Sequence, residues 1–350
     1  MKRCFVSFLA LVLVLVLAMG ACSAVGADNS PDKSDAAASD TAAPAVTPDQ
    51  TAAAEPLRIG LIVSGSVNDN GWCATAYNAL LEIEQLFGAK INFVENVGVS
   101  DIEAQLINYG EDGYDIVFCH GYEYIDGVVK TAPNFPDTWF AINGGDIGQE
   151  PNVLSINQNT FEKGYLAGIV AGLVTKTGVV GAIGGTDIPA VRDCVDGMEA
   201  GAKYVNPNVN VIKAVTGDNE DSIAALEVAN SMIANHADVL IPVMGSAGLA
   251  VVTACEENGI LLVGTNSDMH EFGPEVVVTS SIAGFNDSMI QIVQQYQAGS
   301  LKAISYNYGI AEDVVKLAPF YQFEDSLPKE TFDKINQVVA DIKSGALKTR

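Results

Sequence analysis

The sequence predicts an α/β protein with two lobes, each built on a doubly wound parallel sheet. Apolar strand-like runs alternate with helix-like segments, and this alternation occurs twice in succession. The runs are almost continuously apolar, which is typical of parallel strands that helices cover on both faces. Residues 57–350 are also long for one compact core. Because ligands of such sheets bind beyond the carboxyl ends of the strands, the loops that follow the strands are the candidate site.

The first series begins with a strand at residues 57–63 and continues with a helix that starts near Trp72. Apolar residues recur in this helix at helical spacing, and Gly88 ends it. The pattern then predicts a strand at 91–97, a helix at 101–109, and strands at 115–119, 138–142 and 153–156.

The second series starts with a helix at 161–175 that is rich in small apolar residues. The pattern then predicts strands at 179–183, 210–215, 239–243, 260–263 and 276–280, and helices at 193–205, 222–234, around Cys255 and at 286–298. We assign residues 57–160 and 268–330 to lobe 1, residues 161–267 to lobe 2 and residues 331–350 to a C-terminal helix.

Residues 1–22 have the layout of a lipoprotein signal peptide. A basic start precedes a run that is apolar from Phe5 to Met19 except for Ser7, and a Met-Gly-Ala-Cys sequence ends at Cys22. This resembles the bacterial lipobox, in which the Cys is lipid-modified, although Met19 stands at the usual Leu. Cys22 is the predicted lipidation site, which would place the protein on the extracytoplasmic face of the cell membrane. The alternative is an ordinary cleaved signal with an incidental Cys.

Residues 23–56 consist mainly of Ala, Asp, Ser, Thr and Pro. Such a segment cannot bury enough apolar surface to offset the entropy lost on ordering, so it is predicted to be a disordered tether. The apolar run before it is short for a membrane span, so the lipid anchor is the expected contact with the membrane.

The charge and the cysteine pattern exclude several functions. The formal net charge is −25, with 43 acidic against 18 basic residues, which disfavours a nucleic-acid partner. No CxxC or His–Cys cluster occurs and the three histidines are scattered, so we expect neither a metal nor a cofactor. Beyond Cys22, the cysteines are predicted to be buried thiols. They are Cys73, Cys119, Cys194 and Cys255.

The loops after two strands of lobe 1 contain aromatic side chains. After the first strand, Asn68 and Asp69 precede Trp72, which could offer a flat stacking surface for a planar ligand. Alternatively, Trp72 only begins the apolar face of its helix. After the third strand, Tyr122 and Tyr124 could flank a ring or pack within the protein. Neighbouring His120 could donate to a ligand or be a satisfied loop histidine.

The loops of lobe 2 contribute polar candidates. Asn219, Met244, Asn266 and Asp268 each follow a predicted strand. Asn266 and Asp268 are separated by one residue, so one could enter the cleft while the other fastens a hinge. The G-x-G-x-x-G fingerprint, the G-x-S-x-G elbow and a paired carboxylate are absent from these loops, so we predict a binding protein and not an enzyme.

Several segments together resemble the basic membrane protein family, the purine-nucleoside-receptor-like lipoproteins. The likeness covers nearly all of residues 57–321. The matching segments are Asn70-Gly71-Trp72, Gly113-Tyr114-Asp115, Phe135-Pro136-Asp137, residues 164–172, 201–207 and 264–268, and Leu317-Ala318-Pro319-Phe320.

The resemblance implies a type I periplasmic-binding-protein fold that serves an ABC importer and its permease, with a purine nucleoside or purine base as the ligand. It implies that Trp72 stacks on the ring and that Asn266 and Asp268 meet the ribose or the base. This chain departs from the family at Cys73, where an amide is expected, at Ala283, where nucleoside binders have Lys, and at Asn219, where some base binders have Trp. A sensor for a membrane signalling receptor and an enzyme of nucleoside metabolism are the alternatives.

Overall fold

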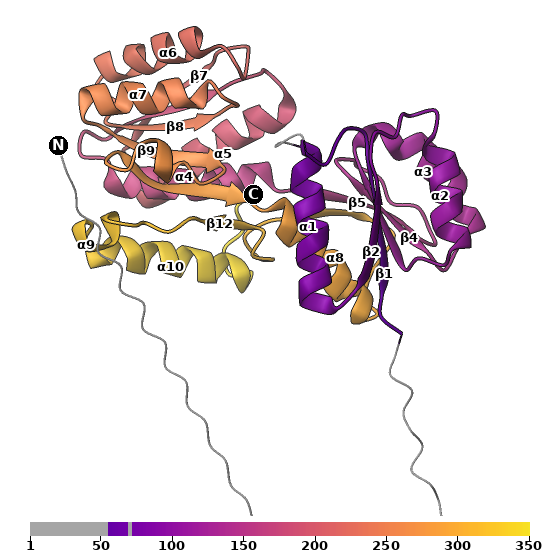
Figure 1. Cartoon of the computed structure of the whole chain (residues 1–350). Helices are drawn as coiled ribbons and strands as arrows, with labels where there is room; N and C mark the ends of the chain where they lie inside the picture. Colours follow the sequence, from indigo (N-terminus) through magenta and orange to yellow (C-terminus); the bar gives the residue numbers. More distant parts are fainter. Residues whose placement is uncertain (1–54, 69–71) are drawn as a thin grey trace, which may run out of the picture. The chain divides into compact units, whose positions relative to one another are not determined.

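The computed structural model describes residues 55–68 and 72–350 (Figure 1). The predicted signal peptide, Cys22 and the tether up to residue 54 lie outside the described residues, as does Asp69. The chain forms two six-stranded sheets, and both are covered by helices. This confirms the predicted α/β class with two doubly wound lobes. Within the described part, none of the helices combines the length and apolarity needed to cross a membrane.

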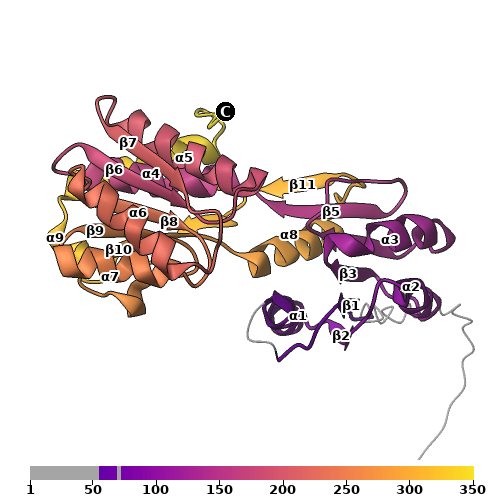
Figure 2. The same ribbon diagram turned by 90° about the horizontal axis from the view of Figure 1, so that it is seen from above.

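The first lobe is a parallel sheet in the order β11-β5-β4-β3-β1-β2. Helices α1 and α8 pack on one face, and α2 and α3 pack on the other. Figure 2 shows β11 beside β5 at the edge of this sheet. Its elements are β1 (Arg58–Val63), α1 (Trp72–Phe87), β2 (Lys90–Val94), α2 (Ile102–Glu111), β3 (Ile116–His120), α3 (Ile125–Thr131), β4 (Trp139–Asn143), β5 (Val153–Gln158), α8 (Phe285–Gln297) and β11 (Ser305–Tyr308).

The second lobe has the strand order β12-β10-β9-β8-β6-β7, and β12 is antiparallel to β10. Helices α4, α5 and α10 cover one face, and α6 and α7 cover the other. Its elements are α4 (Thr160–Val174), β6 (Val179–Gly184), α5 (Pro189–Val205), β7 (Asn210–Val215), α6 (Ser222–Ala234), β8 (Val239–Val243), α7 (Gly248–Asn258), β9 (Leu261–Asn266), β10 (Val277–Ala283), β12 (Val315–Leu317), α9 (Phe323–Ser326) and α10 (Lys329–Lys343).

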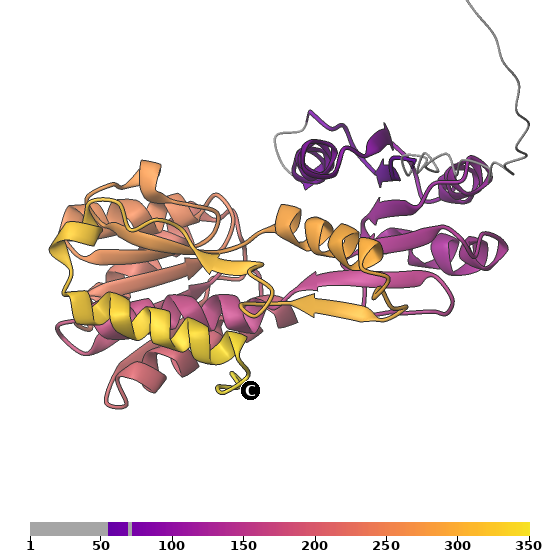
Figure 3. The same cartoon turned by 90° about the horizontal axis from the view of Figure 1, so that it is seen from below.

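The lobe boundaries differ from those that the sequence suggests. Residues 268–330 do not all belong to lobe 1, because β10 pairs with β9 and β12 pairs with β10 in the second sheet. Of this segment, α8 and β11 complete the first lobe. The chain therefore passes between the lobes after β5, after β10 and after β11. Figure 3 shows the yellow helix α10 lying along the second lobe, where Ile335 and Val338 enter its core.

Helices α4 and α5 pack with their backbones in contact. Glycines line the contact on both helices, and a Cβ atom added at Gly168 would lie 2.0 Å from the carbonyl oxygen of Met198. A Cβ atom at Gly201 would lie 1.9 Å from the carbonyl oxygen of Tyr165. The small residues that the sequence places in α4 are therefore required by this close approach. The contact also fixes the position of α4 relative to α5.

The buried cysteines should resist thiol reagents in the folded protein. Burial raises the pKa of Cys194 to about 11 and that of Cys255 to about 12, and it raises the pKa of Cys119 further still. Because the thiolate is the reactive species, a disulfide reagent at about pH 8 should label these thiols only after unfolding in urea. Mass spectrometry of the labelled peptides measures this. Labelling of the native protein as fast as of the unfolded protein would contradict it.

Candidate functional site

An aromatic cluster lies at the carboxyl ends of the strands in the first lobe. We define it as Trp72, which begins α1, His120, which ends β3, and Phe285, which begins α8. The ring centroids of Trp72 and His120 are 4.1 Å apart, and those of His120 and Phe285 are 4.8 Å apart. Trp72 is 54% exposed whereas His120 is buried. The broad ring of Trp72 is therefore exposed to solvent, and the buried ring of His120 packs against it.

Hydrogen bonds hold His120 in place beneath Trp72. Its Nε2 lies 3.0 Å from the carbonyl oxygen of Trp72, and its Nδ1 lies 3.0 Å from the side-chain amide nitrogen of Asn143. A carbonyl can only accept, so Nε2 carries the hydrogen and Nδ1 accepts from Asn143. This arrangement suits a neutral imidazole, and it fixes the position of the first residue of α1.

The other candidates of the first lobe are not part of this cluster. Asn68 is exposed, and its backbone nitrogen donates to the hydroxyl of Ser66. Tyr122 is exposed but lines a different cavity. Tyr124 is fully buried and donates from its hydroxyl to the carbonyl oxygen of Val97, at 2.7 Å. The structure thus corrects the expectation for Tyr124, because a side chain inside the core cannot touch a ligand.

Three of the four candidates of the second lobe lie together at the carboxyl ends of its strands. Asn266 donates from its side-chain amide to the carbonyl oxygen of Met244, at 3.2 Å. Asn219 accepts from the backbone nitrogen of Thr186, at 2.9 Å, and it lies beside Met244 around Gly185. Met244, Asn266 and Phe272 line a cavity of about 350 Å³. The second lobe thus offers amide groups beside a small, partly apolar hollow.

Asp268 has a different role from Asn266. Its carboxylate accepts from the hydroxyl of Tyr321 and from the backbone nitrogen of His270. The rings of Tyr321 and His270 are stacked, with centroids 3.7 Å apart. Asp268 therefore fastens the C-terminal segment to the loop after β9, while Asn266 faces the hollow.

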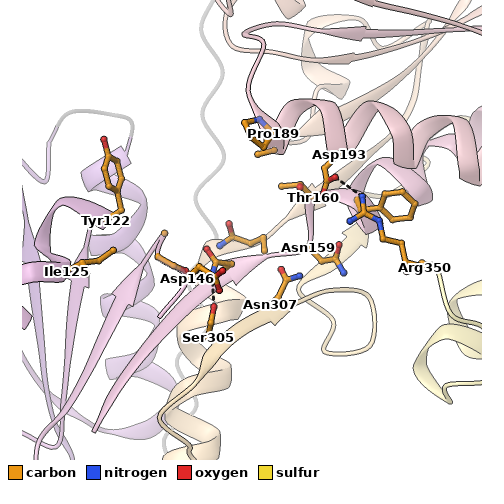
Figure 4. Close-up of a pocket in the computed structure, with 17 residues that line it drawn as sticks. Tyr122, Ile125, Asp146, Asn159, Thr160, Pro189, Asp193, Ser305, Asn307 and Arg350 are labelled. Atoms are coloured by element: carbon orange, nitrogen blue, oxygen red, sulfur yellow. Dashed lines mark hydrogen bonds and ion pairs between the residues drawn. The ribbon is translucent and has the colours of Figure 1, made fainter. Parts of the chain in front are cut away.

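A cavity of about 990 Å³ lies at the chain crossings after β5 and β11 (Figure 4). Polar and apolar side chains both line it, and several of the polar groups already bind one another. Asp193 pairs with Arg350 at 2.6 Å, and Arg350 lies over the ring of Phe161. Among the predicted site residues that the structure describes, only Tyr122 lines this cavity.

The sequence does not identify two residues that contact the candidate site, one in the aromatic cluster and one beside Asn266. Phe285 was missed because the helix was expected to begin at residue 286, one position too late. Lys163 was missed because it lies in an apolar helix far in sequence from the candidate loops, yet its Nζ is 2.6 Å from the side-chain oxygen of Asn266. A lysine in a helix that is apolar on all sides has no face on which to reach solvent, and this signal could have drawn attention to it.

Comparison with known proteins identifies the family. Residues 57–349 match the Bmp family, described as ABC transporter substrate-binding protein PnrA-like. The chain belongs to this family. The resemblance to basic membrane proteins is thereby confirmed, and Bmp proteins are extracytoplasmic substrate-binding proteins of ABC transporters.

Relatives and solved structures are similar to this chain over most of its length. A purine-binding protein of Brucella abortus is 28% identical over 298 residues, which cover 84% of this chain and 83% of the relative. A transcriptional activator of the comK gene from Bacillus halodurans has a TM-score of 0.71 at 24% identity, and the match covers 83% of this chain and 99% of that one. An ABC transporter solute-binding protein from Conexibacter woesei has a TM-score of 0.67 at 23% identity, over 83% and 98%. The two structures establish the shared fold.

Proposed function

We propose that this Bmp protein captures a purine nucleoside or purine base outside the cell and delivers it to the permease of an ABC importer. The observation that carries the proposal is the exposed ring of Trp72, supported by His120 at 4.1 Å. A purine is flat and apolar on both faces, so it gains most from stacking on such a ring. The name of the purine-binding relative from Brucella abortus supports the same ligand class.

Ligand capture proceeds by closure of the two lobes. The aromatic cluster supplies the face that stacks on the ring, and the amides of Asn219 and Asn266 supply hydrogen bonds to its polar edge. The crossings after β5 and β11 are joined by a hydrogen bond of 2.8 Å from the backbone nitrogen of Asn159 to the carbonyl oxygen of Tyr308. A ligand that contacts both lobes favours the closed form, which the permease then recognises.

The predicted lipoprotein signal peptide is also part of this proposal. Lipidation at Cys22 anchors the protein to the extracytoplasmic face of the cell membrane, and residues 23–56 give the lobes freedom to reach the permease.

A thermal-shift panel on the purified protein tests the ligand. A ligand at 100 times its Kd stabilises the native state by about 2.7 kcal/mol, so at least one purine base or nucleoside should raise the melting temperature by several degrees. Pyrimidines and free sugars serve as controls. If another compound class raises the melting temperature and no purine does, the ligand assignment is wrong. Release of free base from inosine or adenosine would show turnover and contradict a role in binding alone.

A further inference from the structure

Lys163 is a cation whose side chain is almost completely buried. The residue is 8% exposed, and its Nζ lies 2.6 Å from the side-chain oxygen of Asn266. Among the ion pairs of the residues that the structure describes, none includes Lys163. A buried ammonium that faces only a neutral amide is unfavourable for folding, so its presence indicates a role beyond stability.

The position of Lys163 in its helix makes the charge still less favourable. It lies in the first turn of α4, where the helix dipole is positive and a cation is destabilised. The neighbouring carboxylate of Glu162 forms no ion pair with Lys163 and instead accepts from the backbone nitrogen of Ile310 at 2.7 Å and from the hydroxyl of Thr349 at 3.0 Å. The backbone here is held firmly, since the hydroxyl of Ser281 donates to the carbonyl oxygen of Lys163 at 2.8 Å.

Asn266 links this ammonium to the hollow of the second lobe, because it bonds to Lys163 and also lines the hollow. Its backbone is left-handed, with φ of 68°, and its amide nitrogen is engaged by the carbonyl oxygen of Met244. The amide oxygen therefore faces Lys163, while Asn266 itself is exposed and lines the cavity of about 350 Å³. An ammonium has three N–H donors and no acceptor, so donors beyond the one given to Asn266 remain for a ligand.

We propose that Lys163 determines ligand specificity by donating a hydrogen bond to an acceptor oxygen of the ligand, either the 6-oxo group of a purine or a ribose hydroxyl. The inference rests on the proposed function, which places a purine on Trp72. An ammonium cannot accept a hydrogen bond, so it discriminates against an amino group at the position that it faces. Asn266 acts as the positioning residue for Lys163.

Isothermal titration of Lys163→Met with hypoxanthine, inosine, adenine and adenosine tests this proposal. Methionine keeps the length of the side chain and removes the charge, so thermal unfolding of the variant without ligand should show no loss of stability. We expect affinity for ligands that carry the recognised oxygen to fall about 10- to 100-fold, as for loss of a charged hydrogen bond. Affinity for adenine, which has no oxygen, should change less than about threefold.

The pattern of losses distinguishes the two oxygens. Weaker binding of hypoxanthine and inosine alone identifies the 6-oxo group, and weaker binding of inosine and adenosine alone identifies the ribose. Lys176→Met is the matched control, because Lys176 is exposed and lies just beyond the opposite end of the same helix, about 20 Å away at 1.5 Å per residue. This control should bind all four ligands as the wild type does.

Two results would overturn the inference. One is unchanged affinity of Lys163→Met for all four ligands, and the other is an equal loss for all four, adenine included. If Lys163→Met does not fold, Lys163→Leu takes its place, because leucine also removes the ammonium and is apolar. It should give the same ligand ranking, and an unchanged ranking contradicts the proposal. If the wild type binds no purine at all, the proposed function fails and the inference falls with it.

Discussion

Replacing Trp72 with alanine should weaken the binding of a purine about 10- to 100-fold while leaving the protein folded. Stacking of a base on an aromatic side chain contributes about 1–3 kcal/mol, and alanine removes the whole stacking face. Because Trp72 is 54% exposed and lies at the start of α1, its loss removes little core packing. Isothermal titration measures the affinity, and thermal unfolding without ligand measures the stability.

Matched variants separate stacking from other causes. Trp72→Phe keeps an aromatic face and should retain most of the affinity. Tyr204→Ala removes another exposed aromatic residue, 41% exposed on α5 of the second lobe, and reports whether the loss at Trp72 is specific to the aromatic cluster. If Trp72→Ala binds purines as tightly as the wild type, the ligand does not stack on Trp72 and the proposed site is wrong.

The sequence predicts most of the fold because the central strands of both sheets are buried on both faces. Continuous apolar runs mark the central strands of both sheets, and Gly88, with φ of 63°, ends α1 where the spacing predicts it. The edge strands of the two sheets have weaker sequence patterns. Strands β11 and β12 are short and partly polar, so their assignment to separate lobes depends on tertiary pairing. The lobe boundaries were wrong for the same reason, since only pairing with β9 places β10 in the second sheet.

The candidate site is less predictable, because position after a strand does not determine which way a side chain points. Tyr122 and Tyr124 are separated by one residue, yet one is exposed and the other is buried. Asn266 and Asp268 likewise separate, one toward a hollow and one toward Tyr321. Phe285 joins the aromatic cluster from helix α8, and Lys163 contacts Asn266 from helix α4. No spacing in the sequence links these two residues to the strand-end loops.

Replacing Gly168 with alanine should destabilise the second lobe by at least about 2 kcal/mol. In an exposed helix the same change would stabilise by about 1 kcal/mol, because alanine restricts the unfolded chain. Here the added methyl group would meet the carbonyl oxygen of Met198, which belongs to the backbone and cannot rotate away. Urea unfolding followed by circular dichroism measures the change as a lower midpoint at an unchanged m-value.

Gly248→Ala is the matched control in the same lobe. A methyl group at Gly248, the first residue of α7, would lie 3.6 Å from its nearest neighbours, which is ordinary contact, so stability should change by less than about 0.5 kcal/mol. If Gly168→Ala is as stable as this control, the backbones of α4 and α5 do not touch as described. Since Lys163 lies only five residues before Gly168 on α4, separation of the two helices should also move the ammonium. Gly168→Ala should therefore weaken the ligands that Lys163 recognises more than adenine.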